Sequence, residues 1–353
     1  MSAQVEFAWP LIGHEKIKKF LQAGVVERRL AQTYLFYGPE KVGKTTLAKY
    51  LAKTVFCASF AEYNKLSNIL TDSASLSKLP CGTCESCQQF DRGIYPEFYL
   101  VEREINEKTE ELRQNITINQ VRELQNKLNK RSFSDSYKVA IIRGAETLTK
   151  EASNALLKTL EEPTPKTILI LLTTAREMIL ETIQSRSQNL QFLPVTRKEI
   201  EAYLISKGLA RSQADEIASL AQGRPTIALK YLENQDIVKE QLVESEKWLE
   251  LLAQNNQGKL KGAEKIVQGK PSTDSLIRGL TSFSIVLRDL LLVQAGQLDL
   301  ITFRELIPVM QQSVKEKMDL DLTKLLQRIE QAKVQLKQNV NARLILENLF
   351  LNI

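Results

Sequence analysis

Residues 34–56 read YLFYGPEKVGKTTLAKYLAKTVF, and this stretch is the clearest indication of the fold of the first part of the chain. An apolar run, residues 34–37, leads directly into a glycine-rich loop, residues 38–43. Residues 45–56 follow with apolar side chains at helical spacing. A buried strand, a loop of this composition and a helix, in that order, predict a phosphate-binding loop in an α/β domain with a parallel sheet.

Each residue type in such a loop has a defined task. Gly38 and Gly43 let backbone N–H groups turn toward phosphate oxygens, and the next helix adds its positive N-terminal end. Lys44 would reach the outer phosphates, and Thr45 would place its hydroxyl on a magnesium ion. Such a loop can bind ATP or ADP, and its sequence leaves open whether this one does. The alternative is a glycine-rich turn with a chance lysine, which the flanking strand and helix disfavour.

The strand that should complete this chemistry lacks its acids. Residues 138–146 read KVAIIRGAE. A nucleotide hydrolase of this type needs an Asp after the apolar run to hold magnesium, and a second acid to orient the attacking water. Arg143 and Gly144 stand there instead. Glu146 is three residues further on, where we expect a turn or helix to aim it away. The sequence predicts that nucleotide can bind but is not hydrolysed.

Four cysteines form a second pattern: Cys57, Cys81, Cys84 and Cys87. The last three give two overlapping C-x-x-C spacings, and four thiolates match the tetrahedral preference of a structural zinc ion. Because the protein would fill all four positions, such an ion would fold the loop without activating water. Free or redox thiols are the alternative. Residues 58–80 between the cysteines read in part as a polar surface insertion.

The composition bounds the class of protein. The chain has 353 residues, 43% apolar and 25% charged, as in a soluble globular protein of two or three domains. A net charge of +6 permits contact with nucleic acid without arguing strongly for it. The single histidine, His14, excludes His-rich metal sites and argues against a histidine-based catalytic triad. No signal-peptide pattern opens the chain, so we expect a cytoplasmic protein.

The hydrophobic pattern of the sequence changes along the chain. Residues 1–193 contain all-apolar runs at 34–37, 139–142 and 168–172, typical of strands with both faces covered. We expect residues 194–239 to form a small helical domain and residues 240–353 a larger helical one. The hydrophobic stretch from Leu276 to Val293 contains three charged residues, which favours a buried helix over a membrane span.

Taken together, these segments resemble the bacterial clamp-loader AAA+ family, whose members work with DNA polymerase III. The resemblance runs through the phosphate loop, including Thr46, through the four cysteines, and through further strings spread over almost the whole chain. These strings are IGHE at 12–15, NALLKTLEEP at 154–163 and NVNARLILENL at 339–349.

The resemblance implies roles for two further positions. Arg186, in Ser185-Arg186-Ser187, stands where the family carries an arginine finger that enters the ATP site of a neighbouring subunit. A planar guanidinium is suited to bracing charge on a γ-phosphate. A surface arginine in a local ion pair is the alternative. Thr174 is the better match to the end of the sensor 1 strand, and Thr226 falls where motor subunits carry a sensor arginine.

The missing acids favour a stationary subunit of the loader over its motors. The resemblance then implies an AAA+ domain with a zinc module, a small helical lid domain and a helical collar. The partners would be the gamma/tau ATPases and delta in a hetero-pentamer, which loads the sliding clamp on primed DNA, with no membrane. The chain would thus be part of a DNA-directed DNA polymerase holoenzyme. The alternatives are a self-sufficient ATPase motor and a zinc-based DNA-binding module, the latter disfavoured because few basic residues flank the cysteines.

Overall fold

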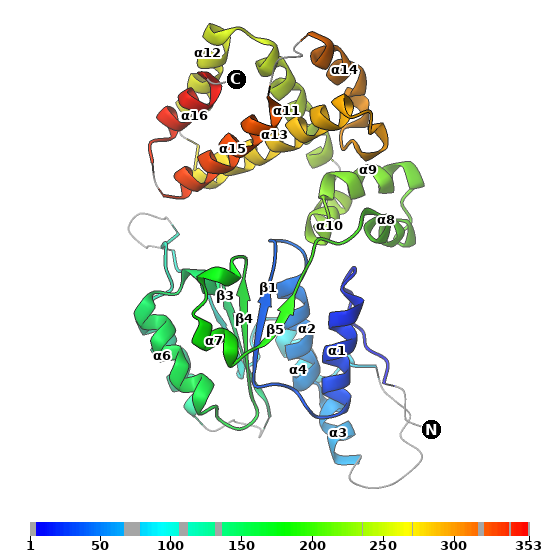
Figure 1. The fold of residues 1–353 in the computed structure, drawn as a ribbon. Helices are drawn as coiled ribbons and strands as arrows, with labels where there is room; N and C mark the ends of the chain where they lie inside the picture. The colour runs from blue at the N-terminus through cyan, green and yellow to red at the C-terminus, as the bar shows by residue number, and fades with distance from the viewer. Residues whose placement is uncertain are drawn as a thin grey trace. The chain divides into compact units, whose positions relative to one another are not determined.

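The computed structural model describes residues 5–66, 78–105, 112–130, 136–234, 236–269, 271–316, 321–338 and 340–351. Part of the predicted insertion, residues 67–77, and Asn339 at the start of the 339–349 string lie outside the described residues. The chain forms two compact units, residues 1–200 with 223–226, and residues 201–222 with 227–353 (Figure 1).

The first unit is built on a parallel five-stranded sheet with strand order β2-β3-β4-β1-β5. Its strands are β1 (Thr33–Tyr37), β2 (Phe98–Val101), β3 (Lys138–Arg143), β4 (Thr167–Thr173) and β5 (Gln188–Gln191). The three strands predicted from apolar runs are confirmed as β1, β3 and β4. The sequence did not predict β2 and β5, because these edge strands are only partly buried and lack a continuous apolar run.

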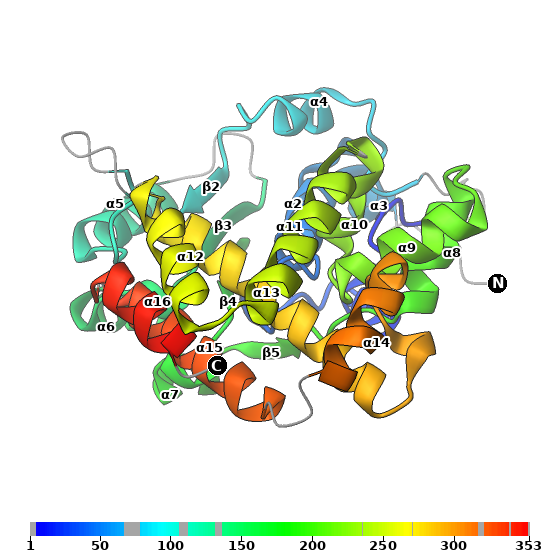
Figure 2. The ribbon, with the colours of Figure 1, turned by 90° about the horizontal axis from the view of Figure 1, so that it is seen from above.

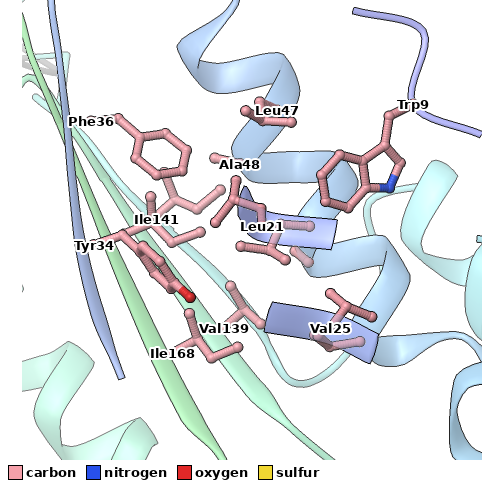
Figure 3. Close-up of a cluster of buried hydrophobic side chains, with 14 of the residues drawn as sticks. Trp9, Leu21, Val25, Tyr34, Phe36, Leu47, Ala48, Val139, Ile141 and Ile168 are labelled. Carbon is pink, nitrogen blue, oxygen red and sulfur yellow. The ribbon is translucent and has the colours of Figure 1, made fainter. Parts of the chain in front are cut away.

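Helices cover both faces of this sheet, as the apolar runs predict. Tyr34 and Phe36 point into one hydrophobic cluster, whereas Leu35 of the same strand points into another. The first cluster packs against α1 (Glu15–Val26), α2 (Lys44–Phe56), α3 (Ala58–Leu66) and α4 (Glu85–Asp91). Figure 3 shows its centre, where Trp9, Leu21 and Val25 face strand residues such as Ile141. The second cluster packs against α5 (Ile118–Asn129), α6 (Lys150–Glu161) and α7 (Glu181–Ser185).

The first unit also contains two short 3-10 turns and a segment from later in the chain, residues 223–226. The 3-10 turns η1 (Ala145–Thr147) and η2 (Arg176–Met178) follow β3 and β4. The unit extends to residue 200, somewhat beyond the predicted border at 193, and takes in residues 223–226. The reason is local: the backbone N–H of Val195 donates to the Gly223 carbonyl at 2.9 Å, and that of Thr226 donates to the Lys41 carbonyl at 3.2 Å.

The second unit is helical throughout its described residues. Two helices span the borders of the units, α8 (Arg197–Ser206) and α10 (Pro225–Glu233). The others are α9 (Arg211–Ala221), α11 (Asp236–Ala253), α12 (Asn256–Gln268), α13 (Thr273–Gln294), α14 (Ile307–Glu316), α15 (Leu322–Lys337) and α16 (Ala342–Leu351), with 3-10 turns η3 (Leu298–Leu300) and η4 (Arg304–Leu306). Figure 2 shows these helices from above. The division of this region at about residue 240 stays a prediction.

The second unit has a hydrophobic core of its own. Trp248 stacks on Phe283 with ring centroids 4.6 Å apart. Leu322, Leu325 and Ile329 are buried within the chain itself, so the apolar stripe of α15 has an internal core to pack against. The hydrophobic stretch 276–293 lies in α13, as predicted for a buried helix. In the described part of the chain, no helix is long and apolar enough to cross a membrane.

Candidate functional site

The loop between β1 and α2 has the backbone conformation that its glycines predict. Gly38 has φ +136°, and a Cβ there would come within 2.0 Å of the Phe192 carbonyl oxygen. Gly43 has φ +109°, and a Cβ there would lie 2.5 Å from the Leu11 side chain. Both positions therefore need glycine for its conformation and for space. The loop leads directly into α2, whose N-terminal residue is Lys44.

A pocket of about 670 Å³ opens at this loop. The predicted ligand-binding residues Gly43, Lys44, Thr45, Thr46 and Thr174 all line it, together with Thr226. The structure thus brings together most of the nucleotide-binding residues expected from the sequence. Their role as ligands to a nucleotide stays a prediction.

Lys44 is folded back onto the loop. Its ammonium donates to the carbonyl oxygens of Gly38 at 2.5 Å and Pro39 at 2.6 Å. Burial lowers the pKa of Lys44 to about 8, although the carboxylates of Glu146 and Glu40 act in the opposite direction. The side chain is therefore a buried cation at the floor of the pocket, using two of its three hydrogen-bond donors on the loop itself.

The end of β3 carries the expected cation, but a partner neutralises it. Arg143 lines the pocket and forms an ion pair through Nη2 with Oε2 of Glu102. The sequence gives no signal for Glu102, because this residue follows the edge strand β2, which lacks a continuous apolar run. A pairing across neighbouring strand ends becomes visible only once the strand order is known.

The expectation for Glu146 is wrong: its carboxylate lines the pocket. Gly144 has φ +76° and turns the chain into η1 immediately after β3. This turn brings Glu146 back over the end of β4, where its Oε1 accepts from the Thr174 hydroxyl at 2.7 Å and from the Thr174 N–H at 3.3 Å. A glycine directly after the strand was the available signal, since it permits such a tight reversal.

The remaining residues near the loop support it. The Thr173 hydroxyl is buried and donates to the Ala175 carbonyl at 3.1 Å, so Thr174 is the residue that presents its hydroxyl to the pocket. His14 Nε2 lies 2.9 Å from the carbonyl oxygen of Val42 in the loop. Burial lowers the pKa of His14, with the Val42 carbonyl acting in the opposite direction. The IGHE string therefore packs against the phosphate loop.

Arg186 lies apart from this pocket, at the C-terminal end of α7. Its Nη2 lies 3.0 Å from Oε1 of Glu161, and its Nη1 donates to the Thr182 carbonyl at 3.3 Å. The guanidinium is partly exposed and is not among the residues that line the described phosphate-loop pocket. The local ion pair that the sequence analysis raised as an alternative is thus present, and the role as a finger stays a prediction.

The four cysteines converge although one of them is distant in sequence. Their Sγ atoms all lie within 4.8 Å of one another, and none forms a disulfide. Cys57 ends α2, whereas Cys84 precedes α4 and Cys87 lies within it. Hydrogen bonding from Cys87 lowers the pKa of Cys57, which favours the thiolate form that binds a metal. Four sulfur donors that close around one point fit a structural zinc ion.

A phosphate loop after the first strand of a parallel sheet, a cysteine module and a second, helical unit are the features of an AAA+ type of fold. The chain belongs to the family described as DNA polymerase III, delta subunit, whose model matches residues 13–196.

Individual relatives agree with this assignment. The chain is 28% identical to DNA polymerase III subunit delta' of Bacillus subtilis (strain 168), over 95% of this chain and 94% of that one. It is 30% identical to subunit delta' of Pseudomonas aeruginosa over 56% of this chain and 55% of that one. It is 32% identical to subunit tau of Bacillus subtilis over 54% of this chain, but over only 30% of tau.

Proposed function

We propose that this chain is a delta-prime-like stationary subunit of a DNA polymerase III clamp loader. In this role it helps a hetero-pentamer with gamma/tau ATPases and delta to place the sliding clamp on primed DNA in the cytoplasm. Its own contribution is structural, and Arg186 acts in the ATP site of a neighbouring subunit. The observation that carries the proposal is the match to a delta' subunit along nearly the whole chain.

The end of β3 supports a stationary role. Arg143 and Gly144 occupy the two positions where a motor subunit needs acids, and the guanidinium of Arg143 is engaged with Glu102. Without a second acid, nothing at position 144 can orient an attacking water. The chain then depends on its neighbours for ATP hydrolysis.

The position of Arg186 supports action in trans. Its guanidinium is partly exposed outside the chain's own pocket and, among the described residues, pairs with the carboxylate of Glu161. Such an exposed pair holds the side chain weakly. A neighbour's phosphates, with several negative charges, can therefore compete for the guanidinium.

The cysteine cluster supports a structural metal. Bound zinc would tie the end of α2 to α4 through Cys57 and Cys87. Because all four ligands come from the protein, the ion would leave no open position for catalysis. Its contribution would be to the folding of this module.

The replacement Arg186→Ala tests the role in trans. In a reconstituted loader we expect hydrolysis at the neighbouring site to fall by about 10³-fold or more, because an arginine finger contributes that much to kcat. The total rate of ATP hydrolysis with clamp and primed DNA should then fall by the part that this neighbouring site contributes. Assembly of the ring should be unchanged. Unchanged hydrolysis in a fully assembled ring would remove Arg186 from the proposal.

Arg211 offers a matched control for this experiment. Its guanidinium also pairs with a surface glutamate, Glu201, at 3.5 Å, and its side chain is 88% exposed. Arg211→Ala removes the same charge and a similar ion pair, so it should leave ATP hydrolysis at the wild-type level.

A self-sufficient motor is the second candidate, favoured by the carboxylate of Glu146 in the pocket. The isolated chain, incubated with ATP, magnesium and primed DNA, separates the two proposals. Sustained phosphate release by the purified chain supports the motor, whereas its absence supports the stationary subunit.

A further inference from the structure

We propose that the phosphate-loop pocket binds a magnesium–nucleotide complex and that Glu146, held by Thr174, supplies the carboxylate that position 143 lacks. The ligand class is a nucleoside di- or triphosphate with a divalent cation. This inference concerns the chain's own pocket and is independent of Arg186, so either proposal can fail without the other.

The first argument is the unequal environment of the two carboxylate oxygens of Glu146. Oε1 accepts two hydrogen bonds from Thr174, one from the hydroxyl and one from the backbone N–H. Oε2 is buried and has no hydrogen-bond partner among the described residues. A buried carboxylate oxygen without a partner is costly. Because this oxygen has almost no accessible surface, a shift of the side chain would bring it to a bound cation, and that contact would remove the cost.

The second argument is the position of Glu146 relative to the loop. Glu146 lies in the same pocket as Lys44 and Thr45, and its charge acts on the Lys44 ammonium. The lysine and the start of α2 favour phosphate, and the threonine hydroxyl is suited to magnesium. The pocket therefore offers donors for an anion and, from another strand end, a carboxylate oxygen for the metal.

The arginine at position 143 does not prevent metal binding. The Glu102 carboxylate pairs with Arg143, so this cation is neutralised within the lining of the pocket. A side chain with an engaged charge repels a divalent ion less than a free one would. The acid proposed to support the metal thus lies in the turn after β3 and not at the strand end.

This arrangement binds nucleotide without consuming it. Glu146 supplies one carboxylate, and Gly144 supplies none for the attacking water.

Calorimetric titration of the full chain with ADP, with and without Mg²⁺, tests the proposal. For the wild type we expect Mg²⁺ to tighten ADP binding. In Glu146→Gln the amide oxygen can still accept from Thr174, but the negative charge is lost. We expect the increase in ADP affinity that Mg²⁺ causes to be smaller by about tenfold or more in this variant. The ADP affinity measured in EDTA should stay the same or increase.

Glu40→Gln is the matched control. Glu40 is an exposed acid that lines the same pocket and also acts on Lys44. If only the total negative charge of the pocket attracts Mg²⁺, both variants lose the Mg²⁺-dependent increase in ADP affinity equally, and the proposal fails. It also fails if the wild type binds ADP equally well with and without Mg²⁺, or not at all, or if Glu146→Gln retains the full gain. Thermal unfolding of each variant verifies that the fold is intact.

Discussion

At the scale of single residues, Lys44 is the side chain on which phosphate binding depends most directly. It is buried, its ammonium is close to two loop carbonyls, and burial lowers its pKa to about 8. Only the protonated form carries the charge that attracts phosphate. The affinity of the pocket for a nucleotide should therefore depend on pH near neutrality.

The sign of this dependence follows from the direction of the pKa shift. Below about pH 7 the lysine is protonated and ADP affinity should be constant. Above about pH 8 a proton must be taken up on binding, so affinity should fall by up to about tenfold per pH unit. Titrations between about pH 6.5 and 9.5 measure this profile.

Lys44→Arg is the control for this titration, because a guanidinium stays charged over the whole range. Its affinity should show a smaller decline above pH 8. A wild-type affinity that is flat up to about pH 9.5 would contradict the assignment of the phosphate contact to Lys44.

At the scale of elements, the cysteine cluster joins the end of α2 to α4. Cys57 ends α2, and its Sγ accepts from the backbone N–H of Cys81 at 3.3 Å. Cys84 N–H donates to the sulfur of Cys81 at 3.4 Å. These bonds stabilise negative sulfur, which is the form that binds a metal.

Removal of the metal should therefore loosen this module. We expect about one zinc ion per chain and its loss in Cys87→Ser, with the free energy of unfolding lowered by about 2–4 kcal/mol. Metal analysis and denaturant unfolding measure the two quantities. Ser86→Ala in the same helix is the control, because Ser86 is not part of the cluster. Four thiols that react fully before any chelator is added would instead indicate free cysteines.

At the scale of the whole molecule, the chain leaves the first unit after residue 200 and returns to it at 223–226. Gly223 makes this return possible. It has φ +73°, and a Cβ there would lie 2.6 Å from the Pro194 Cβ and 2.9 Å from the Val195 carbonyl oxygen. The same short segment delivers Thr226 to the lining of the pocket.

Gly223→Ala should consequently destabilise the first unit by about 2–4 kcal/mol, through the strained φ and through the steric clash. Gly93→Ala is the matched control: Gly93 has φ +72°, and a Cβ there meets nothing within 4 Å. It should cost only about 1 kcal/mol. Denaturant unfolding measures the free energy of unfolding of both variants. An equal loss in the two would show that the close contacts at Gly223 do not contribute to stability.

Features that depend on residues close together in the chain could be predicted without the structure. The apolar runs of β1, β3 and β4 identify strands covered on both faces, and the glycines and Lys44 identify the loop, because these patterns reflect local backbone geometry and burial. The same local reasoning found the cysteine spacing and the loss of acids after β3. It missed β2 and β5, whose edge positions require no continuous apolar run.

Which strand ends lie next to each other is known only from the fold. The order β2-β3-β4-β1-β5 sets Glu102 beside Arg143, and the turn at Gly144 brings Glu146 onto Thr174. Residues 102 and 174 are far apart along the chain, so no spacing in the sequence links them to position 143. Side-chain charges act through space over a few ångströms, and for that reason the electrostatics of this pocket follow from the fold and not from the motif.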